Sequence, residues 1–392
     1  MDIFQKCRNY TQAREAMEEG IYPYFIPLDE NEGTEVEYEG NRLIMCGSNN
    51  YLGLTTHPKV KEAAIDAVKR YGTSCTGSRF LNGTLALHEQ LEQELAEFVG
   101  KDEALVFSTG MQVNLGTISS LISRDDVVIM DKDDHASIVD GARLGYGKIE
   151  RFNHNDIDHL ERVLKSIPED LGKLIVVDGV FSMGGDLADL PNIIPMAEKY
   201  DARIMVDDAH GMGVTGGGRG TAEEYGMSQD VDLIMSTFSK SFASLGGFVA
   251  GDDDVIHFVK HNARSLIFSA SIPASNAASA LAALEIIRSE PERVERVNAV
   301  AEKIRRELSA MGFNVGNSVT PIVPVIIGDD DLTFLTWKTL FENGVFVNPV
   351  ISPAVPPGFQ LLRTSYMATH TDEQIDQVLE TFQRVGKQLP IL

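Results

Sequence analysis

A lysine and an aspartate stand at the ends of two expected strands, and together they could hold an aldehyde cofactor. Residues 231–235 form a short, mostly apolar strand pattern, and Lys240 follows it among small hydroxyl residues. Residues 203–206 form a second apolar pattern that ends at Asp207. A lysine amine forms an imine with an aldehyde, and a carboxylate keeps a pyridine nitrogen protonated so that the ring accepts electrons. The ordered pair therefore indicates a pyridoxal phosphate enzyme.

Small residues that follow the strand expected at 104–107 could bind a phosphate group. Ser108 and Gly110 stand between an expected strand and a helix that begins near Met111. The free N–H groups of a helix N-terminus, together with hydroxyl groups, bind phosphate. Plain helix capping is the alternative, but Lys240 in the same sheet favours the phosphate.

Two further polar residues are associated with apolar strands. His135 follows the strand expected at 127–130, where an imidazole could stack on a cofactor ring. No second histidine lies at ligand spacing, so no metal site is expected there, and helix capping is the alternative. Arg363 lies in the apolar segment 361–365 and needs an anion. A substrate carboxylate or a structural salt bridge would supply one.

Residues 211–216 match the dinucleotide-binding pattern G-x-G-x-x-G, but their context does not fit that function. The segment opens no helix, and residues 207–210 separate it from the preceding strand. We therefore expect a mobile or tightly turned glycine loop beside the site. An NAD oxidoreductase would depend on this segment alone.

The order of the expected elements predicts an α/β fold. From about residue 58, apolar strands alternate with helices, which is typical of a mainly parallel sheet covered on both faces. Ligands bind beyond the carboxyl ends of such strands, and the polar clusters fall there. The expected strands are 104–107, 127–130, 174–177, 204–206, 233–235 and 248–250.

Three regions are expected along the chain. Residues 1–45 would form a helix over 1–20 and two short strands. Residues 46–280 would form a large cofactor-binding domain, and residues 281–392 a smaller α/β domain. A capping-box pattern at Thr371 predicts the start of the last helix.

Composition narrows the function classes. The 392 residues are 43% hydrophobic and 23% charged, as in an ordinary globular enzyme. A net charge of −24 argues against nucleic acid and against broad attraction to anionic lipid. Three cysteines without metal-ligand spacing, and no signal sequence, favour a reducing cytoplasm. No apolar run approaches the ~18 residues of a membrane span.

A series of segments, taken in order, resembles the α-oxoamine synthases. These are fold-type-I pyridoxal phosphate enzymes that condense an amino acid with an acyl thioester. The segments that carry the resemblance are 48–54, 76–84, 135–142, 179–186, 207–210 and 237–240. Within the family, residues 80–84, 237–241 and 347–356 are most similar to bacterial members that use L-serine and a long-chain acyl-CoA.

The resemblance implies roles for residues around the cofactor ring. Lys240 would carry the cofactor and then remove and return the Cα proton of the substrate. Asp207 would pair with the pyridine nitrogen. His210 would bind the ring hydroxyl, with Ser182 nearby, and His135 would stack over the ring.

The resemblance also implies residues that bind the substrate and the phosphate. Asn49 and Arg363 would orient the substrate carboxylate together with His135. The implied phosphate site comprises Gly110, Thr237, Ser239 and the partner subunit's Ser271, with Ser108 and Met111 beside them.

The function implied by the resemblance is a decarboxylating condensation. A cytoplasmic homodimer, with active sites at the subunit interface, would join L-serine to palmitoyl-CoA and release CO₂, CoA and 3-ketodihydrosphingosine. The alternatives with the same chemistry are cysteate with acyl-CoA, alanine with a pimeloyl thioester, and glycine with acetyl-CoA. A regulatory protein on an inactive scaffold is the rival from another class, and the intact Lys240, Asp207, His210 and His135 argue against it. The lipid product leaves peripheral contact with the inner face of the membrane open.

Overall fold

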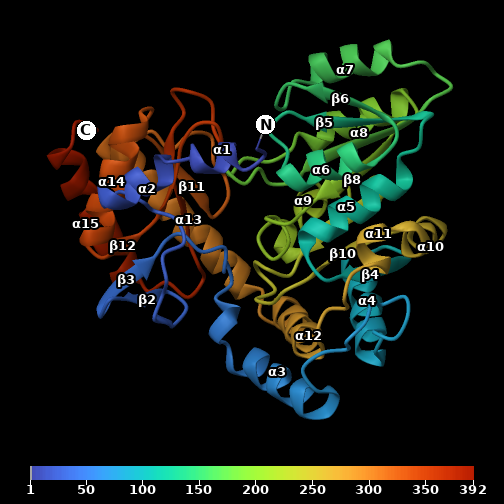
Figure 1. The fold of residues 1–392 in the computed structure, drawn as a ribbon, viewed down its shortest axis with the longest axis horizontal. Coiled ribbons are helices and arrows are strands. Elements are labelled where there is room, and N and C mark those ends of the chain that lie inside the picture. The colour runs from blue at the N-terminus through green and yellow to red at the C-terminus, as the bar shows by residue number, and fades with distance from the viewer. Residues whose placement is uncertain (1) are drawn as a thin grey trace.

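The apolar segments predicted as strands form the central sheet of the larger lobe. In the computed structural model, which describes residues 2–392, this sheet has seven strands in the order β4-β10-β9-β8-β7-β5-β6 (Figure 1). Strand β10 is antiparallel to both of its neighbours, and the other pairs are parallel. The predicted α/β fold with a mainly parallel sheet is confirmed. The strands are β4 (Glu103–Phe107), β5 (Asp126–Asp131), β6 (Lys148–Phe152), β7 (Gly172–Asp178), β8 (Arg203–Asp207), β9 (Leu233–Thr237) and β10 (Gly247–Gly251).

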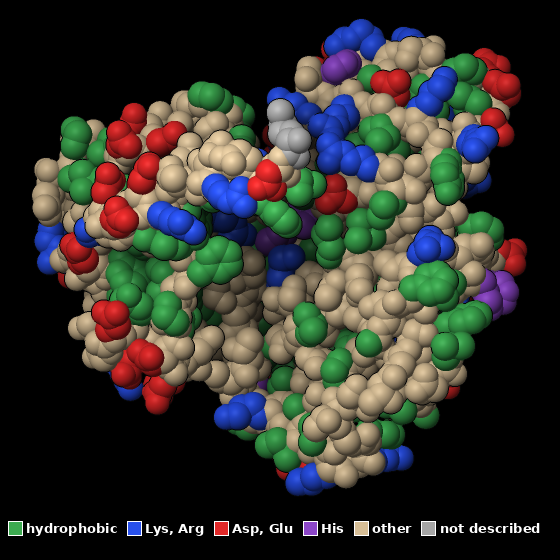
Figure 2. All heavy atoms as spheres, in the orientation of Figure 1, with side chains coloured by type: hydrophobic (Ala, Val, Ile, Leu, Met, Phe, Trp, Pro, Cys, Tyr) green, Lys and Arg blue, Asp and Glu red, His purple; other side chains and the backbone are tan. Residues whose placement is uncertain are grey.

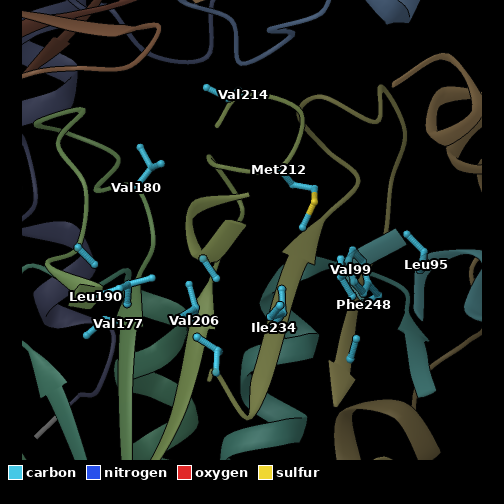
Figure 3. Close-up of a cluster of buried hydrophobic side chains, with 14 of the residues drawn as sticks. Leu95, Val99, Val177, Val180, Leu190, Val206, Met212, Val214, Ile234 and Phe248 are labelled. Carbon is cyan, nitrogen blue, oxygen red and sulfur yellow. The ribbon is translucent and has the colours of Figure 1, made fainter. Parts of the chain in front are cut away.

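Alternate side chains of these strands enter two apolar layers, one on each face of the sheet. Val177, Val206 and Ile234 belong to the layer drawn in Figure 3, whereas Val176 and Met205 belong to the opposite layer. Helices cover both layers (Figure 1). They are α3 (Pro58–Tyr71), α4 (Ala86–Val99), α5 (Gly110–Leu121), α6 (Ala136–Leu144), α7 (Ile157–Ser166), α8 (Leu190–Lys199), α9 (Thr221–Glu224), α10 (Asp253–Asn262), α11 (Arg264–Ile267) and α12 (Ala274–Ser289).

Strand β6 was not anticipated from the sequence. It lies at the edge of the sheet, and every residue in it except Phe152 is exposed. An edge strand keeps polar side chains in water, so the apolar run that marks a buried strand is absent.

The smaller lobe combines the C-terminal segment with the N-terminal strands. An antiparallel sheet has the order β11-β14-β13, formed by Ile322–Ile326, Leu361–Ser365 and Asn348–Val350. In a second sheet, strand β3 (Asn41–Met45) pairs in parallel with β12 (Val345–Phe346). The other elements here are β1 (Glu30–Asn31), β2 (Glu35–Tyr38), α13 (Glu292–Met311), α14 (Asp330–Glu342) and α15 (Asp372–Gln388). Helix α15 begins after Thr371, which forms the predicted capping box with Gln374.

The prediction of a single helix over residues 1–20 is wrong. Helix α1 spans Gln5–Arg8 and helix α2 spans Gln12–Glu18, and neither buries a residue. The break coincides with Asn9, Tyr10 and Thr11, which are weaker helix formers than the residues on either side. Helices this short gain little stability without tertiary packing. Residue 1 lies outside the described residues. No helix within residues 2–392 combines the length and apolar character that crossing a bilayer would need.

Candidate active site

A cavity of about 300 Å³ lies beyond the carboxyl ends of β7, β8 and β9. Figure 2 shows a hollow between the two lobes, with basic and histidine side chains on its floor. The predicted site residues that line the cavity are Gly110, Met111, His135, Asp207, His210, Thr237, Ser239 and Lys240. The fold therefore brings together residues from four separate strand ends, those of β4, β5, β8 and β9.

The Lys240 amine lies among groups that make it less basic than an ordinary lysine. Burial lowers its pKa to about 8, although the carboxylates of Asp207 and Asp178 act in the opposite direction. The guanidinium of Arg363 lowers the pKa further. A larger share of neutral, nucleophilic amine is therefore present near physiological pH.

Acylation of Lys240 in the cofactor-free protein should follow this lowered pKa. Only the neutral amine reacts with acetic anhydride, so the rate should rise with pH and level off above about 8, rather than near the ~10.4 of an ordinary lysine. Mass spectrometry of peptides modified at different pH values gives the rate at each lysine, and the exposed Lys69 supplies a reference curve. A midpoint near 10 for Lys240 would contradict the prediction.

Asp207 is held at the end of β8 by two hydrogen bonds. The side-chain amide of Asn114 donates to its Oδ2 at 2.7 Å, and the backbone N–H of Ala209 donates to its Oδ1 at 3.1 Å. Asn114 also donates to Ser137 Oγ at 2.8 Å. Sequence reasoning missed Asn114, although it lies one helical turn after Gly110 and so on the same face of α5.

A second buried acid, Asp178, lies beside Asp207 at the end of β7. Burial raises the pKa of Asp178 well above its usual range, and the neighbouring Asp207 and Asp134 raise it further. Burial also raises the pKa of Asp134 well above its usual range, and the neighbouring Asp131 adds to the rise. Asp178 accepts a hydrogen bond from the backbone N–H of His135 at 3.2 Å. Asp178 had been given no role from the sequence.

His210 is buried and shares a hydrogen bond with Tyr51. The Tyr51 hydroxyl lies 2.7 Å from His210 Nδ1, and it lies 3.2 Å from Asn49 Oδ1, to which it donates. Burial lowers the pKa of His210 well below its usual range, and the charges of Lys240 and Arg363 add to this effect. The imidazole is therefore neutral, and it takes one fixed orientation in the cavity wall. Tyr51 lies in one of the segments that carried the family resemblance, but it had been given no role.

His135 both caps a helix and lines the cavity. Its Nδ1 accepts from the backbone N–H of Ser137 at 3.3 Å and lies 2.7 Å from Ser137 Oγ, at the start of α6. The capping alternative and the position at the cavity are therefore compatible, because the cap uses one ring nitrogen and leaves the ring face free.

The start of α5 lies against the end of β9. Thr109 caps the helix by accepting from the backbone N–H of Gln112 at 3.1 Å. A Cβ atom at Gly110 would lie 2.7 Å from the Thr237 side chain, so only glycine permits this approach. The hydroxyl groups of Thr237 and Ser239 lie 2.9 Å apart beside the helix end. Free N–H groups and two hydroxyls thus surround one corner of the cavity.

Three of the predicted cofactor residues do not line the cavity of this chain. The Ser108 hydroxyl donates to the carbonyl of Ala270 instead. Ser271 is buried and donates its backbone N–H to Gly77 at 2.8 Å. Ser182 lies on the segment after β7, where its carbonyl, rather than its hydroxyl, contacts Arg363.

Arg363 is buried in β14 and is held by two neutral acceptors. Its Nε donates to the carbonyl of Ser182 at 2.6 Å, and its Nη2 donates to Asn49 Oδ1 at 3.0 Å. No aspartate or glutamate in the described part of the chain forms an ion pair with the guanidinium. The salt-bridge alternative therefore lacks a partner here, and the positive charge remains free for an anion. Arg363 and Asn49 are not among the residues that line the cavity, but the guanidinium charge acts on the Lys240 amine inside it.

The glycine loop after His210 encloses a buried carboxylate. Asp208 accepts from the backbone N–H of Thr221 at 2.6 Å and from its hydroxyl at 2.7 Å. A Cβ atom at Gly211 or Gly220 would lie 1.9 Å from this carboxylate. Burial raises the pKa of Asp208 to about 7. The glycines thus allow a tight turn around Asp208 and do not form a dinucleotide site.

The chain is similar in sequence and structure to known proteins of one family. Residues 42–382 match the family described as aminotransferase class I and II. The chain belongs to this family. Serine palmitoyltransferase of Sphingobacterium spiritivorum is 50% identical to it over 99% of this chain and 98% of its own length. A high-resolution structure of SPT with PLP has a TM-score of 0.97 and 37% identity, and each chain covers 100% of the other.

These relatives confirm the resemblance to the α-oxoamine synthases. The 8-amino-7-oxononanoate synthase of Alkaliphilus metalliredigens is also similar, with 41% identity over 97% of this chain and 96% of its own length. The predicted cofactor, pyridoxal phosphate, is confirmed as that of the family.

The cavity in this aminotransferase-family chain fits pyridoxal phosphate on two observations. The contact between Gly110 and Thr237 forms a corner of N–H and hydroxyl donors that suits a phosphate. Asp207 and Lys240 supply the carboxylate and the amine that the pyridine nitrogen and the aldehyde require. The two sets of groups line the same cavity.

Proposed function

We propose that this protein condenses L-serine with a long-chain acyl-CoA, palmitoyl-CoA in the simplest case, and releases CO₂, CoA and 3-ketodihydrosphingosine. The observation that carries the proposal is a lysine amine of lowered pKa in one cavity with Asp207, close to a buried arginine that forms no ion pair with any acid of residues 2–392. Serine palmitoyltransferases at 50% identity support serine and an acyl-CoA as the substrates.

The roles proposed for the ring-side residues follow from their contacts. Bound pyridoxal phosphate supplies an electron sink for the electrons left at the amino acid Cα when a bond breaks. Asp207, fixed by Asn114, would keep the proton on the pyridine nitrogen. Lys240 would take the Cα proton as a neutral amine and later return it. His210, neutral and fixed by Tyr51, would hydrogen-bond the ring hydroxyl.

The residues that bind the substrate carboxylate would determine which bond at Cα breaks. A bond at Cα weakens only when it stands perpendicular to the pyridine ring, because its electrons then enter the π system. Arg363 and Asn49, in contact with each other, would hold the substrate carboxylate with His135 and so turn the Cα–H bond toward Lys240. Attack of the Cα carbon on the thioester carbonyl expels CoA, and loss of CO₂ from the former carboxylate follows.

Replacement of Arg363 by alanine should weaken serine binding by about ten- to a hundredfold, since a charge-assisted contact is typically worth about 1.5–3 kcal/mol. The KM for acyl-CoA should change little. Titration of the cofactor's visible absorbance with serine measures the affinity. Arg363→Lys, which keeps the charge but loses the planar fork, should fall between the parent and alanine. Unchanged serine affinity in Arg363→Ala would show that Arg363 does not bind the substrate carboxylate.

The active enzyme is proposed to be a homodimer in the cytoplasm. Several large apolar side chains are strongly exposed on this chain, among them Leu81 at 79%, Phe268 at 74% and Phe80 at 57%. Exposed apolar groups of this size support a partner surface. In that dimer the partner subunit's Ser271 would complete the phosphate site.

Free cysteines at positions 7, 46 and 75 support a reducing compartment. The lipid product supports peripheral contact with the inner face of the membrane, which vesicle flotation would test.

The substrate proposal is tested by a panel of amino acids against acyl-CoAs of several lengths, with CoA release as the readout. Serine with palmitoyl-CoA should have the highest kcat/KM. Faster turnover of alanine with a pimeloyl thioester, of cysteate, or of glycine with acetyl-CoA would assign the chain to another member of the family. Sedimentation velocity on the same preparation tests the dimer.

A further inference from the structure

A histidine outside the cavity, His154, is held between two carboxylates. Its Nδ1 lies 3.2 Å from Asp131 Oδ1, and its Nε2 lies 2.7 Å from Asp186 Oδ2. Burial lowers the pKa of His154, but the hydrogen bonds and charges of the two aspartates outweigh burial and raise the pKa to about 10. The Phe181 ring packs on the imidazole nearly at right angles to it, with the ring centroids 4.3 Å apart.

His154 is therefore an imidazolium that donates from both nitrogens. Asp131, Asp133 and His154 lie close enough together to suggest a metal site. However, both ring nitrogens of His154 are occupied by protons shared with carboxylates, and neither has a lone pair for a metal. The other acid nearby, Asp133, lies 3.9 Å from Nδ1 and is exposed, so it adds little to the contact.

The two carboxylates belong to different parts of the larger lobe. Asp131 ends β5, whereas Asp186 lies on a hairpin formed by residues 179–188 after β7. The hairpin closes through the antiparallel bridge between Val180 and Leu187. Asn155, next to His154, donates its side-chain amide to the Leu187 carbonyl at 3.0 Å. The segment after β6 thus attaches the hairpin to the end of β5.

The other side of this hairpin contacts the smaller lobe. The Ser182 carbonyl accepts from Arg363 Nε at 2.6 Å. The Gly185 carbonyl accepts from the backbone N–H of Val319 at 3.1 Å and from the Thr320 hydroxyl at 2.9 Å. The position of the hairpin therefore sets the position of one of the two acceptors that orient the guanidinium.

We propose that His154 is a positioning residue for Arg363. The imidazolium fixes the 179–188 hairpin to β5, and the hairpin carbonyl at Ser182 then fixes the direction of the guanidinium. This inference rests on the proposed role of Arg363 in binding the amino acid carboxylate. His154 itself lies outside the cavity lining, so it acts through the hairpin and touches neither substrate nor cofactor.

His154→Gln tests the proposal, because glutamine removes the charge and cannot donate to both aspartates at once. We expect the KM for serine to rise about tenfold, the lower end of the loss expected when the Arg363 contact is removed outright, with an unchanged KM for acyl-CoA and an unchanged cofactor absorbance. His159→Gln is the matched control. His159 is also half-buried and accepts from the Asn153 backbone at 3.1 Å, but it does not contact the hairpin, so its replacement should leave both KM values unchanged.

Hydrogen exchange of the cofactor-free protein gives a readout independent of activity. In His154→Gln, the peptide covering residues 179–188 should exchange faster, while α15 should not change. If His154→Gln does not fold, Asp186→Asn removes one charge from the same contact with little change of shape and should raise the serine KM in the same direction.

The outcomes separate this inference from the function on which it depends. A normal serine affinity in Arg363→Ala would overturn the proposed role of Arg363. A weakened Arg363→Ala together with a normal serine KM in His154→Gln would overturn the positioning role alone. Equal changes in the KM for serine and for acyl-CoA in His154→Gln would also overturn it, because they would indicate a general loss of structure.

Discussion

Lys240→Ala is expected to abolish turnover and leave the protein folded. The Lys240 amine lies in the cavity and contributes no apolar packing to the core, so its loss should cost little stability. Loss of a nucleophile that acts as a unit with its neighbours typically costs about four orders of magnitude or more in rate. CoA release measures the loss, and circular dichroism with thermal unfolding shows whether the fold is kept.

A second lysine supplies the control for this variant. Lys101 is also half-buried and donates to the Val231 carbonyl at 2.5 Å, but it does not line the cavity. Lys101→Ala should keep its activity. Borohydride reduction of the parent holoenzyme, followed by peptide mass spectrometry, should find the cofactor attached to Lys240. Attachment to any other lysine would refute the assignment.

Asp207→Asn is expected to bind the cofactor but to lose most of its Cα proton exchange. Asparagine keeps the shape of the side chain and an oxygen for the Asn114 amide, but it carries no charge to hold the proton on the pyridine nitrogen. We expect the exchange of the serine Cα proton with deuterated water to fall by about 10²- to 10⁴-fold, the usual contribution of a positioned acid or base. Nuclear magnetic resonance of serine measures the exchange directly.

The adjacent Asp208 is the matched control for Asp207. Its carboxylate bonds Thr221 in the glycine loop and does not line the cavity. Asp208→Asn should lower the melting temperature, because one buried hydrogen bond loses its partner, while exchange per folded molecule stays near the parent value. Near-normal exchange in Asp207→Asn would mean that another acid serves the ring.

The sequence predicted best those parts of the fold in which burial leaves a continuous apolar signal. Strands β5, β7, β8 and β9 are buried on both faces, so their apolar runs were visible. Strand β6 has no such signal, because it lies at the edge. The prediction of one N-terminal helix was wrong for a related reason. Neither α1 nor α2 buries a residue that would stabilise one long helix.

Most of the site residues predicted from the sequence stand at or just after strand ends, whereas most of the residues that were missed support them from elsewhere in the fold. Asn114 reaches Asp207, Tyr51 reaches His210, and His154 reaches Asp186, each across a long stretch of chain. Nothing local in the sequence marks such a pair. Arg363 illustrates a further limit, because one of its two acceptors is a backbone carbonyl, which any residue could supply.

The position of the antiparallel strand β10 affects when the cofactor site forms during folding. Gly247 pairs with both Phe107 on β4 and Thr237 on β9, so β10 is the strand that joins them. A Cβ atom at Gly247 would lie 3.0 Å from the Cα of Gly110, which shows how closely the start of α5 rests on this junction. The phosphate corner therefore exists only after β10 has inserted between its neighbours.

Partly folded chains that lack β10 would have no such corner to hold the cofactor phosphate. A ligand that binds only the native state stabilises it by mass action, by about 2.7 kcal/mol when its concentration is 100 times its Kd. The supply of the cofactor should thus control the abundance of this protein in the cell as well as its rate of catalysis. Chains that complete the sheet without bound cofactor are less stable, so they unfold more often to partly folded forms that proteases degrade.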